Sequence, residues 1–215
     1  MNRRIALKQL AGLAVLAGAA GPVVAQRAAA APFVELDTVV ATDSKGKVEV
    51  IEFFHYGCPH CRAFDPLLES WLKRLPTDVA FLRVPAIWGN AQLGKLAQLY
   101  YAIELSGKVE PLHGKVFVAV QDDKVPLHTE EGVREWVAKQ GVDTKAFMDA
   151  YKSFGMQALL KQADQRARDY KIQGVPTMAV DGRFLTSASM TGSHEATLKV
   201  VDDLIARARS QPRRG

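Results

Sequence analysis

Two cysteines, Cys58 and Cys61, make up the whole cysteine content of this 215-residue chain, and Pro59 and His60 separate them. A disulfide between positions i and i+3 closes a very short loop, so it constrains the unfolded chain little and makes a poor structural staple. Two thiols at this spacing suit thiol–disulfide exchange, in which one sulfur is attacked and the other closes the ring. The spacing therefore favours redox chemistry over a structural role.

The residues around the pair predict where each sulfur lies. The run Val48 to His55 is β-branched and aromatic at both odd and even positions, which is typical of a strand buried on both faces. A helix should follow, with Cys58 as its N-cap and Pro59 as its first residue. Free N–H groups and the helix dipole favour a thiolate there, and His60 adds to that effect. We expect Cys58 to be the exposed, reactive sulfur and Cys61 to be deeper and less reactive.

Two other uses of the sulfurs stay open on these residues alone. Cys58, Cys61 and His60 could bind zinc or copper(I), because soft thiolates suit those metals. A closed zinc site needs four ligands, however, and the sequence has no second ligand pair at the usual spacing. A passive structural disulfide is the other alternative. The remaining isolated histidines are interpreted as surface residues, namely His113, His128 and His194.

The cysteines are predicted to lie inside a strand–helix–strand unit. Apolar residues from Phe64 to Leu75 recur at spacings of three and four, which predicts an amphipathic helix that Pro66 kinks and Pro76 ends. Val79 to Val84 is predicted to be the next strand, joined by a right-handed crossover. An edge strand is predicted over Phe33 to Val40.

The second half of the chain is predicted to be helical first and to return to strands later. From Asn90 to Tyr170 the apolar periodicity indicates a series of helices. Strands over 177–180 and 183–185 flank Asp181 and Gly182, a hairpin turn pair, and a last helix is capped by Ser193. Because a two-stranded hairpin alone is marginal, the first and last parts should share one sheet. The predicted fold class is α/β, with a helical block inserted into one sheet.

The first 25 residues are predicted to be a cleaved export signal. A positive start that includes Arg3, Arg4 and Lys8 precedes the uncharged apolar run Leu10 to Val24, and small residues near Ala25 suit a signal peptidase. The run is short for a membrane span, which needs about 20 residues. A retained anchor is the alternative, and the paired arginines leave Sec and twin-arginine export both open.

The charge balance gives no case for a nucleic acid or an anionic membrane as partner. The chain has 28 Lys and Arg against 23 Asp and Glu, but three of the basic residues lie in the signal segment. The rest of the chain is therefore close to neutral, and its basic residues do not produce a strong positive field.

Together these features resemble the DsbA family of periplasmic thiol oxidases. The resemblance rests on Cys58-Pro59-His60-Cys61, on Glu52-Phe53-Phe54 before it, on Gly174-Val175-Pro176 before a strand, and on the helical block. It implies a thioredoxin-like domain with an inserted helical domain. We place the signal peptide at 1–25, the two parts of the thioredoxin-like domain at 33–88 and 173–211, and the inserted helical domain at 89–172.

The resemblance also implies roles for residues near the cysteines. Cys58 would be the exchanging cysteine and Cys61 its buried partner, with Pro59 and His60 between them tuning the pair. Val175 and Pro176 would form a cis-proline loop beside the disulfide and offer backbone groups to an extended substrate.

Glu52 is assigned a role on the same basis. Family members carry a buried acid six residues before the first cysteine, where a raised pKa lets it exchange a proton with the inner thiol. The alternative is a solvated glutamate at the end of the sheet. The family often has a lysine on the next strand near this acid. We place that position at Phe81, and the sequence leaves open whether Arg83 reaches Glu52.

The expected function is that of a periplasmic oxidase that donates its Cys58–Cys61 disulfide to reduced, newly exported polypeptides. The resemblance implies that a quinone-linked inner-membrane oxidase, similar to DsbB, recharges it. We expect a monomer with no metal and no cofactor beyond the cysteine pair. The alternatives are a disulfide reductase or isomerase on the same fold, or the metal carrier considered above.

Overall fold

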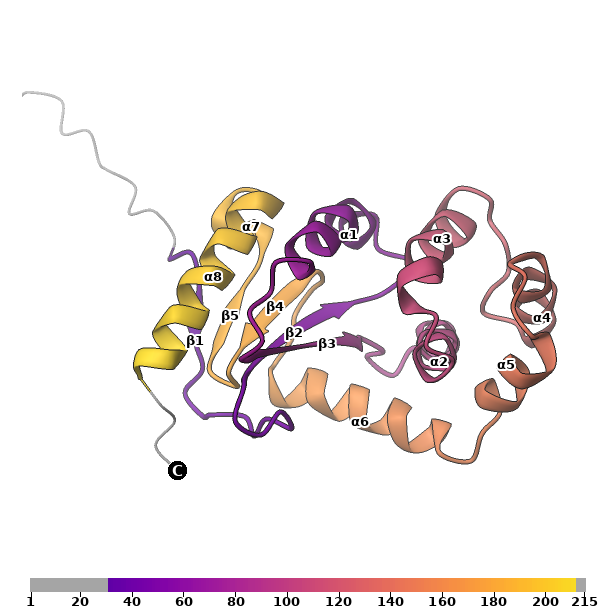
Figure 1. The fold of residues 1–215 in the computed structure, drawn as a ribbon, viewed down its shortest axis with the longest axis horizontal. Helices are drawn as coiled ribbons and strands as arrows, with labels where there is room; N and C mark the ends of the chain where they lie inside the picture. Colours follow the sequence, from indigo (N-terminus) through magenta and orange to yellow (C-terminus); the bar gives the residue numbers. More distant parts are fainter. Residues whose placement is uncertain (1–30, 212–215) are drawn as a thin grey trace, which may run out of the picture.

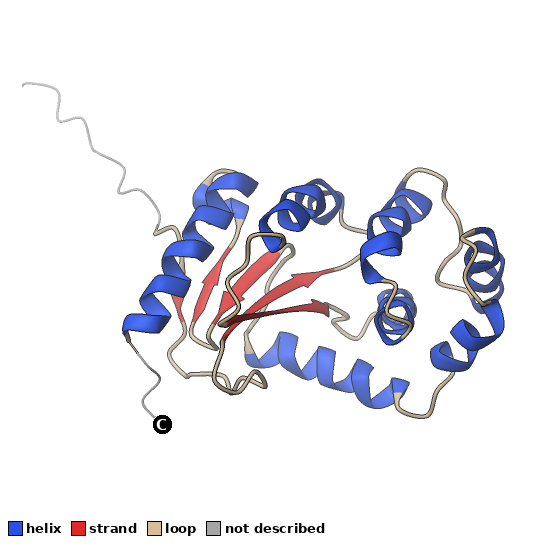
Figure 2. Ribbon diagram, in the orientation of Figure 1, coloured by secondary structure: helices blue, strands red, loops and turns tan. Residues whose placement is uncertain are grey.

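The computed structural model describes residues 31–211, so the predicted signal peptide of residues 1–25 lies outside the described part. Within that part, a five-stranded sheet has the order β1-β5-β4-β2-β3 (Figures 1 and 2). The strands are β1 (Val34–Glu35), β2 (Val48–Phe54), β3 (Val79–Pro85), β4 (Thr177–Val180) and β5 (Phe184–Thr186). Strand β2 is central, parallel to β3 and antiparallel to β4.

The predicted strand–helix–strand unit around the cysteines is confirmed. Helix α1 (Pro59–Leu72) begins at Pro59 with Cys58 as its N-cap, and it leads from β2 into β3. The helix ends at Leu72, earlier than the apolar pattern predicted, because the N–H groups of Arg74 and Leu75 bond to carbonyl oxygens only three residues back and form turns instead of a further helical turn. The edge strand is also shorter than predicted, since only Val34–Glu35 pairs with β5.

The predicted helical block lies between β3 and β4. Its helices are α2 (Ala91–Leu105), α3 (Val109–Gln121), α4 (Glu130–Lys139), α5 (Thr144–Tyr151) and α6 (Met156–Asp169). In Figure 1, α2 to α5 gather beyond the ends of β2 and β3, and α6 runs back toward the sheet. The α/β fold class with inserted helices is therefore as predicted, whereas the domain boundaries at 33–88, 89–172 and 173–211 stay predictions.

Helices cover both faces of the sheet. Helix α8 (His194–Ser210), which follows the short α7 (Ala188–Thr191), packs beside α1 on one face. Their shared core includes Val50, Phe64, Trp71, Met178 and Val201. Helix α6 lies against the other face, where the ring of Tyr170 packs 5.3 Å from that of Phe53. Because β2 is covered on both sides, its side chains are buried along almost its whole length.

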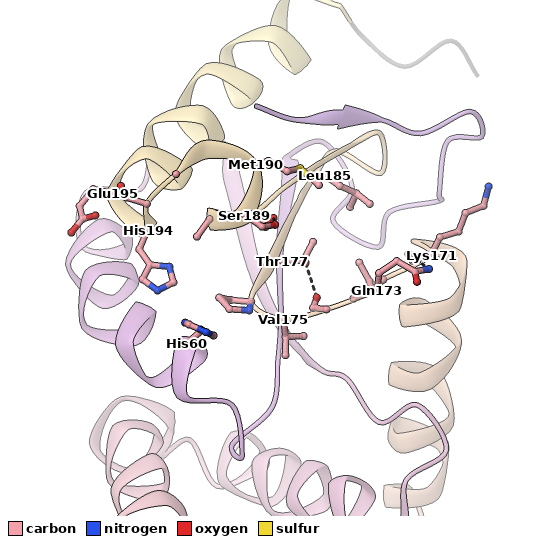
Figure 3. Close-up of a pocket in the computed structure, with 17 residues that line it drawn as sticks. His60, Lys171, Gln173, Val175, Thr177, Leu185, Ser189, Met190, His194 and Glu195 are labelled. Atoms are coloured by element: carbon pink, nitrogen blue, oxygen red, sulfur yellow. Dashed lines mark hydrogen bonds between the residues drawn. The ribbon is translucent and has the colours of Figure 1, made fainter. Parts of the chain in front are cut away.

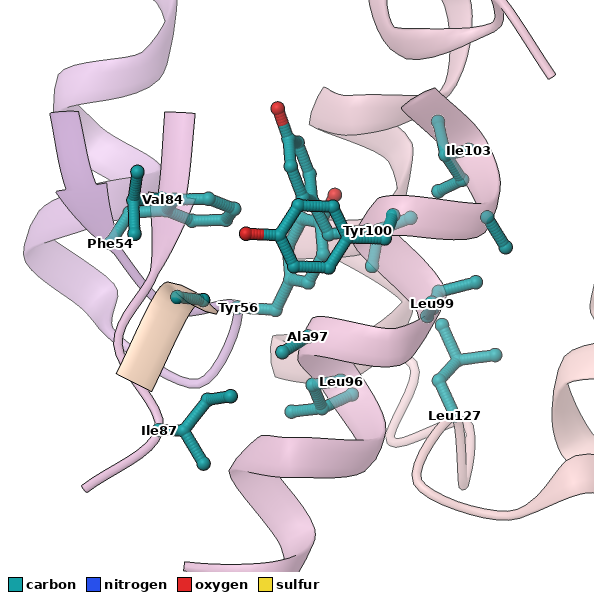
Figure 4. Packing of buried hydrophobic residues seen from close by; sticks show 14 of the residues in the cluster. Phe54, Tyr56, Val84, Ile87, Leu96, Ala97, Leu99, Tyr100, Ile103 and Leu127 are labelled. Atoms are coloured by element: carbon teal, nitrogen blue, oxygen red, sulfur yellow. The ribbon is translucent and has the colours of Figure 1, made fainter. Parts of the chain in front are cut away.

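Aromatic side chains join the end of β2 to the inserted helices. Phe54 ends the strand, and its ring centroid lies 5.2 Å from that of Tyr100 in α2 and 5.0 Å from that of His113 in α3. Tyr56, in the loop that leads to Cys58, packs against the same group (Figure 4). The loop before α1 is thus anchored in the core of the insertion. Within residues 31–211 no helix is long and apolar enough to span a membrane.

Candidate active site

The Cys58 sulfur lies over the N-terminus of α1. It accepts a hydrogen bond of 3.4 Å from the backbone N–H of Cys61, and Cys58 has the extended backbone of an N-cap residue. Across the site, the Cys58 thiol lies 3.4 Å from the carbonyl oxygen of Val175. Both cysteines are free in this structure. Cys58 is only 7% exposed, so it is more covered than expected, because the loop that contains Val175 closes over it.

The two thiols have opposite acid strengths. The pKa of Cys58 is lowered to about 6, first because the Cys61 thiol donates a hydrogen bond to its sulfur, and further by the backbone N–H groups of Cys61 and His60 and the charge of His60, while burial opposes the shift. Burial raises the pKa of Cys61 far above its ordinary value, and its hydrogen bond to Cys58 and the charge of Glu52 add to the shift. One sulfur is therefore held ready to ionise, and the other is kept protonated.

Glu52 lies in the middle of β2 and is buried, not at a solvated end of the sheet. It pairs in register with Arg83 of β3, and the Arg83 Nε donates a hydrogen bond of 3.1 Å to its Oε2. Burial raises the pKa of Glu52 to about 7, and Arg83 limits that shift. The basic residue beside the acid is thus Arg83, because Phe81 lies two residues earlier in the strand and pairs with Val50.

Two further carboxyl groups share Arg83. Its Nη2 lies 2.6 Å from Glu69 Oε1 and 3.6 Å from Asp65 Oδ1, and both acids come from α1. Burial raises the pKa of Asp65 to about 6. The Glu69 side chain is 32% exposed, so the group of Glu52, Arg83, Asp65 and Glu69 extends from the inner thiol to solvent. This arrangement provides ionisable groups along which a proton can leave the interior.

His113 was expected on the surface, and that interpretation is wrong. The side chain is buried in α3, with its Nδ1 2.8 Å from the Tyr56 hydroxyl and its Nε2 3.4 Å from Asp65 Oδ1. Burial, and next the charge of Arg83, lower its pKa well below the ordinary value. The sequence held one overlooked signal, because Phe117 lies one helical turn after His113 on the same apolar face. His128 is exposed, as interpreted.

A cavity of about 660 Å³ opens beside the cysteine pair. Its walls come from the loop around Val175 and Pro176, from α7 with Met190, and from His60 and His194 at the starts of α1 and α8. Figure 3 shows the two imidazoles at the same end of the cavity, and their ring centroids lie 6.5 Å apart. His194 is therefore part of this site and not an isolated surface histidine. The lining is largely apolar.

The structure brings the predicted site residues together. Pro59 and His60 separate the cysteines on the first turn of α1, Glu52 interacts with Cys61 from the strand behind it, and the peptide bond between Val175 and Pro176 is cis and lines the cavity. Asp65, Arg83, His113 and His194 complete the site; sequence reasoning assigned no role to Asp65, His113 or His194 and left the contact of Arg83 with Glu52 open. Within residues 31–211, no group of three or more His, Cys, Asp or Glu residues lies where it could hold a metal ion.

Comparisons with known proteins point to one family. Residues 80–197 match the family model of the DSBA-like thioredoxin domain. The thiol:disulfide interchange protein DsbA of Bordetella parapertussis is 40% identical over 185 residues, which cover 86% of this chain and 88% of that protein. The thiol:disulfide interchange protein DsbA of Pseudomonas aeruginosa is 37% identical over 178 residues, which cover 83% of this chain and 84% of that protein. The crystal structure of Pseudomonas aeruginosa DsbA has a TM-score of 0.80 at 37% identity, covering 84% of this chain and 93% of that one.

The lowered pKa of Cys58 predicts selective alkylation in mildly acidic buffer. In the reduced protein, iodoacetamide should label Cys58 alone, with half of the maximal rate near pH 6, because only the thiolate reacts and the pKa is about 6. Mass spectrometry of the labelled peptides, combined with the rate as a function of pH, provides the measurement. A midpoint near the ordinary cysteine pKa of about 8.5, or label on Cys61, would contradict the assignment.

The buried carboxyl group of Glu52 predicts an unusual pH dependence of stability. Its folded pKa of about 7 lies above the ordinary 4.5, so its contribution to folding is favourable below pH 4.5 and is lost as the pH rises through 7. Glu52→Gln removes this loss. In the reduced protein, we therefore expect the difference between the free energy of unfolding of Glu52→Gln and that of the wild type to increase by roughly 2 kcal/mol in favour of the variant from pH 5 to pH 8.

Glu49 provides a matched control in the same strand. It is also buried, but its Oε2 accepts three hydrogen bonds, from the backbone N–H of Asp43 and from the N–H and hydroxyl of Ser44. Because an amide oxygen is a weaker acceptor than a carboxylate, Glu49→Gln should lower stability at pH 8. Urea unfolding at several pH values compares the two variants. A flat difference for Glu52→Gln across this range would mean that Glu52 stays ionised as an ordinary salt-bridge partner.

Proposed function

The chain belongs to the DsbA family of thiol:disulfide oxidoreductases, and from that premise we propose that it is an oxidase that donates the Cys58–Cys61 disulfide to cysteine pairs of newly exported proteins. One observation carries the direction of the reaction: the Cys58 sulfur accepts the Cys61 N–H at the N-terminus of α1, which favours its thiolate, whereas Cys61 is fully buried, which favours its protonated thiol. Stabilising the reduced form makes the disulfide a stronger oxidant.

The first step forms a mixed disulfide with the substrate. A substrate thiolate attacks the Cys58 sulfur, the bond between Cys58 and Cys61 breaks, and Cys61 leaves with the electron pair. Because burial strongly disfavours a Cys61 thiolate, this sulfur takes up a proton. Glu52, with a pKa of about 7, is the group proposed to supply it, and the acids around Arg83 return that proton from solvent.

The second step releases the product. A second thiolate of the same substrate attacks the substrate sulfur of the mixed disulfide, and Cys58 leaves as a thiolate. The substrate has then lost two electrons to form its disulfide, and the enzyme has gained them as one thiolate and one thiol. Cys58 is a good leaving group because its thiolate is stabilised at the N-terminus of α1, with His60 contributing and Pro59 shaping the turn.

The cavity beside the pair is the proposed substrate site. Val175 and Pro176 line it, and the Val175 carbonyl oxygen lies 3.4 Å from the Cys58 sulfur. A polypeptide that lies along this loop can pair with its backbone while its own cysteine reaches Cys58. The largely apolar lining suits unfolded chains, whose hydrophobic side chains are still exposed.

The setting of the reaction is inferred from the same premise. We propose that the protein acts in the periplasm as a monomer, after export by the signal peptide of residues 1–25. Its substrates are reduced, newly exported polypeptides, and a quinone-linked inner-membrane oxidase similar to DsbB returns it to the disulfide form. No step in this scheme requires a metal or a further cofactor.

The equilibrium of the pair with glutathione tests the direction. Oxidised protein should convert a reduced two-cysteine peptide to its disulfide, and in glutathione buffers the Cys58–Cys61 pair should be mostly reduced under conditions in which an ordinary structural disulfide persists. Trapping with a thiol reagent followed by mass spectrometry quantifies both. A pair that stays oxidised at high concentrations of reduced glutathione would support a reductase instead.

Thermal or urea unfolding of both redox forms provides a second prediction. Folding lowers the pKa of Cys58 to about 6, so the thiolate stabilises the reduced form fully above pH 8.5, and this contribution is lost as the pH falls through 6. Between pH 5 and pH 8 the reduced form should gain about 2.5 kcal/mol over the oxidised form.

Closing so short a disulfide ring favours the oxidised form by only about 2 kcal/mol in the chain-entropy description. The reduced form should therefore be the more stable one at pH 8, and the order should reverse in acid. An oxidised form that is more stable by the same margin at every pH would show that the Cys58 thiolate contributes nothing to folding.

A further inference from the structure

The last residue of α3 contacts the loop that carries Cys58. The Gln121 side-chain amide donates two hydrogen bonds, one of 2.8 Å to the carbonyl oxygen of Tyr56 and one of 3.0 Å to the carbonyl oxygen of Cys58. Both hydrogens of the amide are thus used on two carbonyl groups of one short loop. Gln121 belongs to the inserted helices, and 63 residues separate it from Cys58 along the chain.

The two carbonyl groups lie on either side of Gly57, which is exposed and has no side chain to pack. A glycine at this point has many accessible backbone dihedrals because it lacks a Cβ, and within the loop a hydrogen bond of 3.0 Å from the Cys58 N–H to the His55 carbonyl oxygen closes the turn around it. By holding the carbonyl before and the carbonyl after this residue, the Gln121 amide adds a second restraint, which ties this turn to α3. The orientation of Cys58, which follows immediately, is fixed with it.

The sulfur depends on that orientation. Its hydrogen bond from the Cys61 N–H is 3.4 Å long and comes from the first turn of α1, so a small rotation of the Cys58 backbone would carry the sulfur away from the helix N-terminus. The thiol group also has to stay beside Val175 to meet a substrate. The Cys58 carbonyl oxygen also accepts a hydrogen bond of 3.2 Å from the Arg62 N–H in the first turn of α1, so Gln121 and the helix restrain the same carbonyl group from two sides.

The other side-chain contacts between α3 and this region do not hold the backbone of the Cys58 loop. Asp122 forms an ion pair with Arg62, but both side chains are substantially exposed, and such pairs contribute little. His113 contacts the Tyr56 hydroxyl, so it orients that side chain and makes no hydrogen bond to the loop backbone. Gln121 contacts the backbone on both sides of the flexible residue.

We propose that Gln121 is a positioning residue for Cys58: its side-chain amide fixes the loop at Gly57 so that the Cys58 sulfur stays over the N-terminus of α1. This inference rests on the proposed function, since it takes Cys58 as the reacting cysteine. It gives the helical insertion a direct part in the redox chemistry, in addition to covering the site.

Gln98 offers a matched control elsewhere in the insertion. It is a buried glutamine in α2, and its amide donates a hydrogen bond of 2.7 Å to the carbonyl oxygen of Tyr151. Tyr151 ends α5 and is not part of the loop that carries Cys58. Gln121→Ala and Gln98→Ala each remove one side-chain amide, which holds two backbone carbonyls in the case of Gln121 and one in the case of Gln98. Only the first should affect Cys58.

The experiment titrates the Cys58 thiolate in each reduced variant by its ultraviolet absorbance and records the melting temperature alongside. Gln121→Ala should raise the midpoint of the titration by about half a pH unit or more, which corresponds to a threefold or greater loss of thiolate in mildly acidic buffer. Gln98→Ala should lower the melting temperature and leave the midpoint unchanged. A Gln121→Ala protein that melts lower with an unchanged midpoint would show that the residue is only structural.

Gln121→Glu keeps the inference testable if the alanine variant does not fold. The side chain has the same length, but a carboxylate cannot donate to either carbonyl and brings a negative charge toward the thiolate. Its midpoint should rise further than that of Gln121→Ala, and a midpoint equal to or below the wild type would overturn the proposal. These titrations need no substrate or partner. A failure of the proposed function would instead appear in the wild type, as inactivity toward the peptide.

Discussion

The structure depends on keeping two sulfur atoms, one helical turn apart, in opposite protonation states. The arrangement cannot come from the cysteines themselves, because they are chemically identical. It comes from their positions. Cys58 is the N-cap of α1, beside the free N–H groups of the first turn, whereas the Cys61 side chain points into the core from that same turn and is fully buried. The hydrogen bond from the Cys61 thiol to the Cys58 sulfur then couples the two states, since the group that stays protonated stabilises the one that ionises.

The inner part of the site meets a different requirement. In the proposed reaction the buried Cys61 thiol gains and loses a proton, which calls for a neighbouring group whose pKa is near 7. Glu52 meets that condition because burial raises its pKa while Arg83 limits the rise. Asp65 and Glu69 on α1 also interact with Arg83, so the positive charge of Arg83 is shared among three carboxyl groups. The protonation of Glu52 therefore depends on the charges of Arg83, Asp65 and Glu69 together.

The sequence predicted what is local and missed what depends on tertiary contacts. The N-cap at Cys58, the first helical position of Pro59 and the hairpin at Asp181 follow from neighbouring residues, and all were predicted correctly. The pairing of Glu52 with Arg83 depends on the register of two parallel strands joined by a helix, and nothing in the intervening residues sets that register. The contact of Gln121 with the Cys58 loop depends on how α3 packs, which apolar periodicity alone does not define. The short α7 carries no apolar period, so the pattern could not reveal it.

The order of the strands in the chain has a consequence for how the site is assembled. Central β2 and its cysteines come early, but β4 and the loop at Val175 follow 117 residues after Cys58, beyond all five inserted helices. Contacts between such distant segments form slowly, because a long loop must close first. A chain that emerges residue by residue from the ribosome therefore exposes its thiols before the loop that covers Cys58 has been made. The protein's own cysteines therefore pass through an interval in which they are uncovered, and only the last fifth of the sequence brings the loop that covers Cys58.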